Sequence, residues 1–238
     1  GRRHEFISVH AEGLGEFPEK LIRILLDLAA DVHVAQPDYR KIFAMLSRNE
    51  KTNSGVKLPI GRAHLAEDRA FFYSNPIHSN SECENIKISL SFLREVINQI
   101  VPRVQPDLIH CHDWMSGLIP AAAKHWGIPC LFTLQSLRSA KTPLASIEDW
   151  GIDGAAFWQH LFYERYPANY EETRDTNPLD YLLSGMLAAS HVSTTRFSLM
   201  SEIIEGRSDF FYPPLRNVLA QKWDAGCAGV IPGSSNPP

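Results

Sequence analysis

The sequence lacks the features that mark several classes of protein. It has only 4 cysteines in 238 residues and no CxxC pair, which disfavours a disulfide framework or a zinc ribbon. Glycine and proline number 14 and 16, close to their usual share, which excludes collagen-like and low-complexity chains. Charged residues interrupt every apolar stretch before it could span a bilayer, and no signal peptide opens the chain. We therefore expect a cytoplasmic globular protein with reduced thiols.

An excess of positive charge is also missing. Lysine and arginine number 23 against 27 acidic residues, a formal net charge of −4, so nothing attracts the chain generally to nucleic acid or to an anionic membrane. The 44% of hydrophobic residues is typical of a globular domain. We expect one domain over residues 1–232, followed by a tail, 233–238, that is disordered or begins a hinge to a missing domain.

Short apolar runs alternate with helical periodicities along the chain. A run at 5–9, a glycine turn, an amphipathic pattern over 17–28 and a run at 32–35 together indicate a βαβ unit. Further strands are predicted at 71–73, 108–111, 130–134 and 191–195, and further helices over 86–100, 121–126, 177–189, 196–205 and 213–225. The sequence therefore predicts an α/β fold: a doubly wound, mostly parallel Rossmann-like sheet with helices on both faces.

Two prolines help to set the helix boundaries. Pro102 is predicted to end the helix over 86–100, because proline in a helix interior removes a hydrogen bond and clashes with the preceding turn. Pro178 is predicted to lie in the first turn of the helix over 177–189, which makes Asn177 the candidate N-cap.

Ligands of such sheets gather at the carboxyl ends of the strands, and the first strand is followed there by Gly13 and Gly15. Bare backbone N–H groups at a helix start suit a phosphate, but the same residues also suit a plain tight turn. Glu12 and Glu16 flank the loop and would repel a phosphate. Both interpretations stay open.

A second strand ends in His110, His112 and Asp113. A metal site is conceivable, but no further ligand is nearby in sequence, and hydrogen bonding or packing explains the same residues. We expect no metal and no cofactor.

Several segments resemble one family. The run 106–114, PDLIHCHDW, resembles the strand-end motif of bacterial glycogen synthases and plant starch synthases. Four more segments match that family in order: 6–9 with 13–16, 132–136, 184–195 and 226–232. The resemblance implies one half of a GT-B fold, the N-terminal domain of a retaining glucosyltransferase that moves glucose from a nucleotide sugar to an α-1,4-glucan. Most donor contacts of that family lie in a C-terminal domain that this sequence does not contain.

The resemblance also implies roles for individual residues. Asp113 and Gln135 fall at catalytic positions. The donor sugar nucleotide is implied to bind at His10, Gly13, Gly15 and Ser136. Because that family's N-terminal domain supplies most of the acceptor surface, we also expect Tyr73, His112 and Trp158 to bind the acceptor glucan, although Tyr73 and Trp158 lie in no matched motif. The implied partners are an α-glucan or maltooligosaccharide and, only with a C-terminal domain, ADP-glucose or UDP-glucose.

Several of these positions depart from the family pattern. The family has a lysine at His10, a glycine at Glu12 and a histidine at Gln135. A neutral imidazole neutralises phosphate poorly, and an amide cannot shuttle a proton. We therefore expect degenerate chemistry and an inactive isolated chain. The alternatives are a non-catalytic α-glucan-binding or regulatory relative, and a GT-B enzyme with another donor.

The aromatic stretch over 150–170 allows two interpretations. It either covers the core as a lid with buried aromatics, or presents one or two rings, Trp158 among them, to an oligosaccharide groove with Tyr73 and Asp113. On a helix, Phe157, Phe162 and Tyr166 would share one side.

Overall fold

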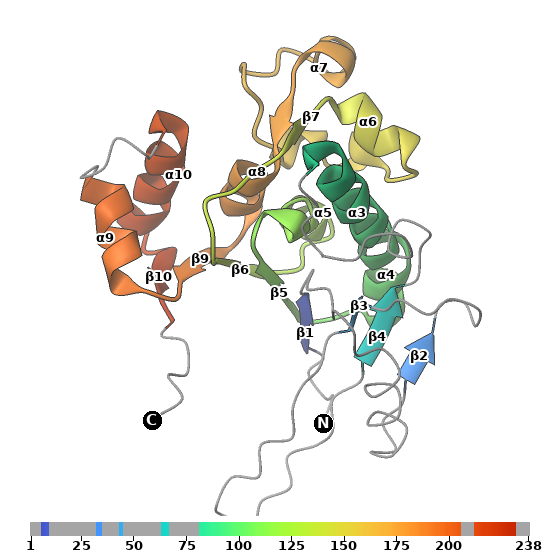
Figure 1. Ribbon diagram of the computed structural model, residues 1–238, viewed down its shortest axis with the longest axis horizontal. Helices are drawn as coiled ribbons and strands as arrows, with labels where there is room; N and C mark the ends of the chain where they lie inside the picture. Colours follow the sequence, from blue (N-terminus) through green and yellow to red (C-terminus); the bar gives the residue numbers. More distant parts are fainter. Residues whose placement is uncertain are drawn as a thin grey trace, which may run out of the picture.

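The computed structural model describes residues 6–9, 32–34, 43–44, 63–66, 81–205 and 212–231. Its central feature is a five-stranded sheet in which every neighbouring pair of strands is parallel (Figure 1). In spatial order the strands are β1 (Phe6–Val9), β5 (Leu108–His112), β6 (Cys130–Leu134), β9 (His191–Thr194) and β10 (Ala228–Val230). The predicted α/β fold with a parallel sheet is confirmed, and β10 is a strand that the sequence did not predict.

The sheet is buried because its strands are apolar runs. Ile109, Phe132 and Val192 have no exposed surface, and Cys111 and Cys130 on neighbouring strands are equally enclosed. The Cys130 thiol donates a hydrogen bond to the sulfur of Cys111 at 3.6 Å and no disulfide joins them, in agreement with the predicted free thiols. Strands buried on both faces are typical of parallel sheets covered by helices.

The covering helices lie in a row (Figure 1). Helix α5 (Ile119–His125) connects β5 to β6, and α8 (Tyr181–Ala188) connects β6 to β9. Both connections move in the same direction across the sheet. Because crossovers between parallel strands are right-handed, both helices lie on the same face of the sheet. Helices α9 (Phe197–Glu205) and α10 (Pro213–Asp224) connect β9 to β10, and α10 packs beside α8. The helix predicted over 17–28 lies outside the described residues.

Two glycines allow α8 to approach the turn after β5 closely. That turn is η2 (Trp114–Ser116), and it is followed by Gly117. A Cβ on Gly117 would overlap the carbonyl of Tyr181, and a Cβ on Gly185 would lie 2.6 Å from the Phe132 ring. Because real Cβ atoms do not approach other atoms so closely, both positions require glycine for packing.

The first predicted βαβ unit is only partly reproduced. Strand β2 (Val32–Val34) forms, but it pairs with β4 (Ala63–Ala66) in a separate three-stranded sheet that also holds β3 (Phe43–Ala44). β1 and β2 therefore lie in different sheets, since pairing over long separations is not determined by the local pattern. The strand predicted over 71–73 and the tail 233–238 lie outside the described residues.

The helix predicted over 86–100 continues past Pro102, contrary to the prediction. Helix α3 (Glu82–Glu95) leads into a π-helical turn, η1 (Val96–Ile100), and then into α4 (Val101–Val104). Pro102 lies in the first turn of α4, where a missing N–H is tolerated, and the wider turn before it lets the chain continue. The helix ends at Gln105, which adopts the left-handed conformation.

The N-cap predicted at Asn177 is also wrong. Asn177 follows α7 (Tyr170–Thr176), and α8 begins four residues later with Asp180 as its N-cap, whose carboxylate accepts from the N–H of Leu183. The intervening β8 (Leu179–Asp180) pairs with β7 (Lys141–Thr142), and this tertiary pairing holds the segment extended. The Asn177 side chain instead bonds both backbone groups of Arg165.

The aromatic stretch over 150–170 is irregular, as predicted, but has no helical face. After α6 (Leu144–Asp149) it holds two short 3-10 turns, η3 (Gly154–Ala156) and η4 (Trp158–His160). Phe157 and Tyr163 are buried, whereas Tyr166 is 95% exposed, so Phe157 and Tyr166 do not share the side that a helix would have given them. The described helices include none that is both long and apolar enough to cross a membrane.

Candidate functional site

The candidate site lies where β5 and β6 end side by side. His112 on β5 is paired with Thr133 on β6, so the residues that follow both strands leave the sheet at one edge. β1 ends there too, because Val9 pairs with Cys111. This is the carboxyl edge, at which parallel α/β sheets bind their ligands.

Asp113 and Ser136 join the ends of the two strands. The backbone N–H of Ser136 donates to Oδ1 of Asp113 at 3.2 Å, and its hydroxyl donates to Oδ2 at 2.7 Å. The N–H of Asp113 in turn donates to the carbonyl of Thr133 at 3.0 Å. The carboxylate is therefore held in one orientation by bonds from the neighbouring strand.

The backbone of Asp113 is strained. Its φ of 59° and ψ of 179° fall in a region that residues other than glycine rarely adopt. The carbonyl of Asp113 accepts from both the N–H and the hydroxyl of Ser116, and these bonds stabilise the turn. Strain of about 1–3 kcal/mol persists only where the surroundings enforce it, and such residues cluster at functional sites.

Burial raises the pKa of the Asp113 carboxyl above its ordinary value, and the hydrogen bonds from Ser136 oppose that rise. The carboxyl is only half-buried, so it remains in contact with solvent. A partly desolvated carboxylate with defined orientation is a good hydrogen-bond acceptor for a ligand hydroxyl.

A second polar group lies beside this pair. The amide nitrogen of Gln135 is 3.3 Å from Nδ1 of His112, and the rings of His112 and His110 lie 4.0 Å apart. His110 bonds the hydroxyl of Thr133 at 2.8 Å. Gln135 is exposed at the edge, where its amide is able both to donate and to accept hydrogen bonds.

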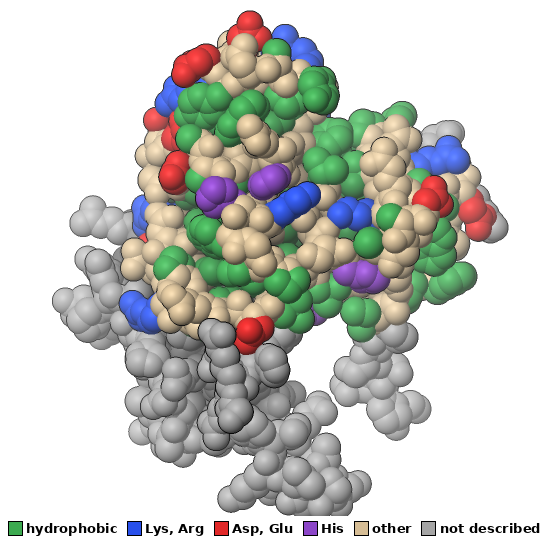
Figure 2. All heavy atoms as spheres, turned by 180° about the vertical axis from the view of Figure 1, so that it is seen from behind, with side chains coloured by type: hydrophobic (Ala, Val, Ile, Leu, Met, Phe, Trp, Pro, Cys, Tyr) green, Lys and Arg blue, Asp and Glu red, His purple; other side chains and the backbone are tan. Residues whose placement is uncertain are grey.

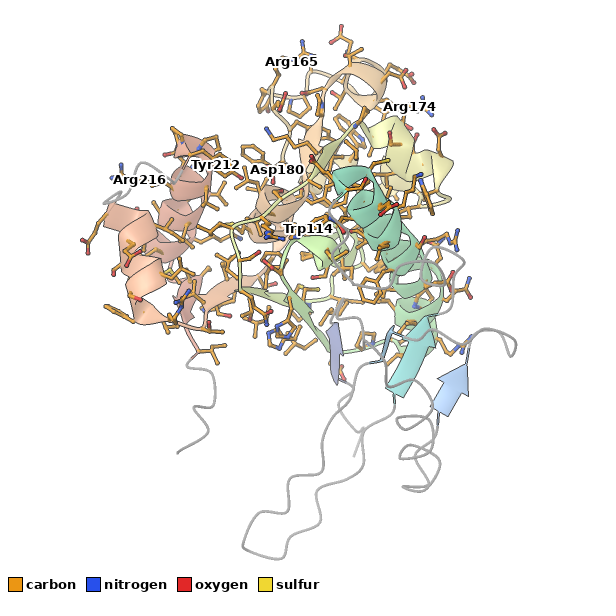
Figure 3. The ribbon with its side chains drawn as sticks, in the orientation of Figure 1. Trp114, Arg165, Arg174, Asp180, Tyr212 and Arg216 are labelled. Carbon is orange, nitrogen blue, oxygen red and sulfur yellow. The ribbon has the colours of Figure 1, made fainter. Side chains whose placement is uncertain are left out.

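A buried carboxylate that the sequence analysis did not single out lies close to this edge. Asp180 is 2% exposed; Oδ1 accepts from the hydroxyl of Ser139 at 2.6 Å, and Oδ2 from the hydroxyl of Tyr212 at 3.3 Å. Figure 3 shows Tyr212 and Asp180 on facing elements. The ring of Tyr181 packs edge-on against Trp114, the residue after Asp113. A carboxylate before an apolar helical run was the one signal that could have marked Asp180, as an N-cap.

The predicted site residues divide into three groups. Asp113, Gln135, Ser136 and His112 lie together at the carboxyl edge. Trp158 lies away from them, in a turn packed against α5 and α8, with its ring edge-on to Tyr170 at 6.0 Å. The remaining predicted residues lie outside the described residues: His10, Gly13, Gly15 and Tyr73.

Metal-ligating side chains are not clustered in the part of the chain that the structure describes. Within it, no group of three or more histidine, cysteine, aspartate or glutamate side chains is placed to hold a metal ion. His110 and His112 are engaged with Thr133 and Gln135 instead.

The chain matches one protein family over residues 5–212, the family described as the starch synthase catalytic domain. Among named relatives, a glycogen synthase from Pseudomonas fluorescens is 34% identical over 133 residues, which cover 53% of this chain and 22% of that protein. A glycogen synthase from Fusobacterium nucleatum is 27% identical over 259 residues, which cover 96% of this chain and 51% of that protein. The chain thus spans about half the length, or less, of these relatives.

A solved structure shows the same fold. The catalytic domain of starch synthase IV from Arabidopsis thaliana, bound to ADP and acarbose, matches with a TM-score of 0.52 and 14% sequence identity. The match covers 81% of this chain and 36% of that one.

Proposed function

Because the chain belongs to the starch synthase catalytic-domain family, we propose that it is the N-terminal, acceptor-side half of a glucosyltransferase resembling glycogen and starch synthases. The reaction would transfer glucose from a nucleotide sugar to an α-1,4-glucan, in a cleft that a second domain completes. The observation that carries the proposal is Asp113, which keeps the family's residue at the strand end and is held there by Ser136.

The edge residues suit the recognition of a sugar. The Asp113 carboxylate accepts hydrogen bonds, and it is oriented before the ligand arrives. The exposed amide of Gln135 both donates to and accepts from hydroxyls. Neutral sugars are recognised by such groups together with aromatic faces.

The same residues suit catalysis poorly. The family has a histidine at Gln135, and an amide neither becomes cationic nor transfers a proton. The loss of one positioned electrostatic group lowers rates by about 100- to 1,000-fold. We therefore propose that the site is degenerate and that the isolated chain does not turn over.

A second function follows from Gln135: a non-catalytic α-glucan-binding or regulatory relative that keeps the acceptor edge. The two proposals differ in the longer protein. If a chain that includes a second nucleotide-binding domain transfers glucose, the enzyme proposal stands. If it binds glucan without transfer, the binding proposal replaces it.

We also propose a cytoplasmic location. All four cysteines are free, and Cys111 and Cys130 form no disulfide although their sulfur atoms lie 3.6 Å apart. Unbonded neighbouring thiols suit a reducing compartment.

Acceptor binding by the 238-residue chain tests the proposal. In an amide-shift titration with maltopentaose, we expect millimolar affinity and perturbed signals at Asp113, Gln135 and Ser136. Asp113→Ala should weaken binding at these signals without unfolding the domain. No perturbation around Asp113 at saturating oligosaccharide would overturn the proposal.

A further inference from the structure

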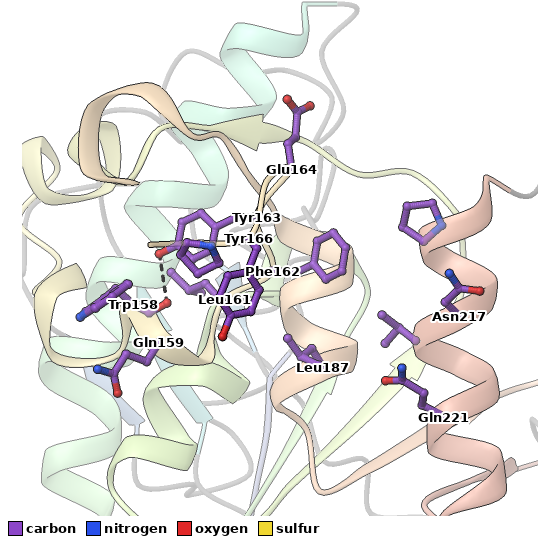
Figure 4. A pocket seen from close by; sticks show the side chains of 13 residues that line it. Trp158, Gln159, Leu161, Phe162, Tyr163, Glu164, Tyr166, Leu187, Asn217 and Gln221 are labelled. Atoms are coloured by element: carbon purple, nitrogen blue, oxygen red, sulfur yellow. Dashed lines mark hydrogen bonds between the residues drawn. The ribbon is translucent and has the colours of Figure 1, made fainter. Parts of the chain in front are cut away.

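A groove lies on the outer surface of the helix layer, away from the strand ends. Residues 158–167 form one wall, α10 forms the other, and Leu187 of α8 lies at the base (Figure 4). Its volume is about 850 Å³, within the range of ligand sites. Seen from behind, hydrophobic side chains adjoin where the upper part of the molecule meets the lobe of α9 and α10 (Figure 2). We call this cavity the aromatic groove.

Three rings line the first wall of the aromatic groove with part of their surface uncovered. Tyr166 is 95% exposed, and Trp158 and Phe162 are half-buried. An exposed tyrosine ring beside two further aromatics is unusual for a surface that serves only packing, because aromatic side chains gain most from burial. Flat apolar faces of this kind are the partners that sugar rings stack on.

The opposite wall supplies hydrogen-bonding groups without charge. Asn217 and Gln221 lie one turn apart on α10 and line the groove, and both are exposed. Within the described residues, neither side-chain amide takes part in a hydrogen bond. An amide both donates and accepts, which matches the hydroxyls of a neutral sugar.

The charge of the aromatic groove excludes anionic ligands. None of its lining residues is a lysine, arginine or histidine. Its one acid, Glu164, is paired with Lys141 at 2.7 Å. A nucleotide or sugar phosphate would find no cationic side chain in the lining, and Lys141 is already paired with Glu164; an uncharged oligosaccharide needs no counter-charge.

The first wall is held rigidly. The N–H of Phe162 donates to the hydroxyl of Ser184 at 3.0 Å, and its carbonyl accepts from the N–H of Asp180 at 2.9 Å. The Tyr163 hydroxyl donates to the carbonyl of Trp158 at 3.0 Å. Pre-organised walls lower the entropic penalty of binding.

We propose that the aromatic groove is a second carbohydrate site, which binds a neutral α-1,4-glucan chain outside the carboxyl edge. The choice of an α-glucan rests on the proposed function; the choice of a neutral oligosaccharide rests on the rings, the amides and the absence of cationic side chains. Such a site would hold a branch of a polymeric substrate near the domain while another chain end occupies the edge. Simultaneous binding at two sites raises overall affinity for a polymer.

Tyr166→Ala in the 238-residue chain tests the proposal, because a side chain 95% exposed is removed without disturbing the core. Titration with maltohexaose should perturb the amides of residues 158–167 and of Asn217 and Gln221. We expect Tyr166→Ala to weaken this response about fivefold to tenfold, and Tyr166→Phe to leave it within about twofold. Gln221→Ala should weaken it as well.

The matched control is Trp223→Ala, which removes an exposed aromatic from the same helix but outside the groove. It should leave the affinity unchanged. Equal affinities of the parent, Tyr166→Ala and Gln221→Ala would overturn the proposal. So would a concentration-dependent dimer, seen by sedimentation, that Tyr166→Ala abolishes while maltohexaose does not perturb the groove.

The readout separates this inference from the proposed function. Signals at Asp113 and Ser136 report the edge, and signals at Phe162 and Gln221 report the groove. Perturbation at the groove alone would support the second site and overturn acceptor binding at the edge. Perturbation at the edge alone would support acceptor binding at the edge and overturn the second site.

Discussion

Ser136 bonds both carboxylate oxygens of Asp113, one through its backbone N–H and one through its hydroxyl, and so ties the turn after β6 to the turn after β5. The bonds orient a side chain whose own backbone is strained, at φ 59°. Asp113 therefore combines an oriented carboxylate with a strained backbone, and different substitutions at this residue separate the two effects.

Comparison of Asp113→Gly with Asp113→Ala should reveal the strain. Both variants lose the carboxylate, but only glycine adopts the Asp113 backbone angles without steric conflict. We expect the glycine variant to be more stable than the alanine variant by about 1–3 kcal/mol. Urea unfolding of the two variants measures the difference, and equal midpoints with equal slopes would contradict it.

The stability of Asp113→Asn relative to the parent should depend on pH. Because burial raises the pKa of Asp113 in the folded state, the native protein keeps this proton to higher pH than the unfolded chain does. Ionisation between the unfolded and folded pKa values therefore favours unfolding, and the parent loses stability through that window as the pH rises. Asparagine does not titrate and is nearly isosteric with aspartate, so the backbone strain at this position is the same in both proteins and cancels in the comparison.

We accordingly expect the stability of Asp113→Asn minus that of the parent to increase from pH 3 upward and then level off. Thermal or urea unfolding of both proteins from pH 3 to pH 8 measures this difference. A stability difference that decreases with pH would show that the folded state lowers the pKa of Asp113 instead of raising it.

Ser136→Ala should raise the pKa of Asp113 further. The hydroxyl of Ser136 stabilises the ionised carboxyl and so lowers its pKa, whereas burial raises it. Without the hydroxyl, fewer hydrogen bonds oppose the effect of burial on the pKa. Carbon-detected titration of the carboxyl in both proteins gives the two pKa values directly. Ser136→Thr keeps the hydroxyl and serves as control; an unchanged pKa in the alanine variant would refute the assignment.

Gly117→Ala should be strongly destabilising. The new methyl would overlap the backbone carbonyl of Tyr181, which cannot rotate away. We expect a loss of more than about 3 kcal/mol, because overpacking against fixed backbone forces α8 to move. Gly127→Ala is the control: its φ is 71° but nothing lies within 4 Å, so only about 1–2 kcal/mol of backbone strain is expected.

The 238-residue chain alone should transfer no glucose. It spans 51% of the Fusobacterium glycogen synthase that it matches, and under the proposed function most donor contacts belong to a second domain. Incubation with labelled ADP-glucose or UDP-glucose and glycogen measures transfer. Label in the washed polymer above that of an Asp113→Ala control would contradict the prediction.

The sequence predicts an element correctly where neighbouring residues alone determine it, and fails where contacts with distant residues decide. The sequence predicts β6 with the observed bounds because 130–134 is an apolar run interrupted only by the β-branched Thr133 and bounded by Pro129 and Gln135. The helix start at Asp180 was missed because Asn177 and Asp180 are both good N-caps, and the choice depends on the pairing of β8 with β7. Pro102 was misjudged because a π-helical turn has no sequence signature.

The candidate site shows the same division. Asp113, Gln135 and Ser136 follow neighbouring strands, so their proximity at the carboxyl edge follows from the fold. Trp158 was assigned to that edge by the aromatic composition of its segment, but the course of an irregular segment is set by tertiary contacts. Phe162 forms hydrogen bonds with Ser184 and Asp180. The segment that contains Trp158 and Phe162 therefore lies beside α8 and not at the carboxyl edge.

The thiol pair within the sheet gives the protein a built-in reporter of unfolding. Burial, together with the adjacent Cys130, raises the pKa of the Cys111 thiol well above its ordinary value. Because both side chains are buried, both sulfurs are also shielded from alkylating reagents in the native state. Cys83 is exposed on the first turn of α3 and Cys227 is half-buried, so we expect these two thiols to be alkylated before the sheet opens. Only the last two adducts in a mass spectrum, those of Cys111 and Cys130, therefore time the opening of the β5–β6 interface, the same interface whose edge carries Asp113.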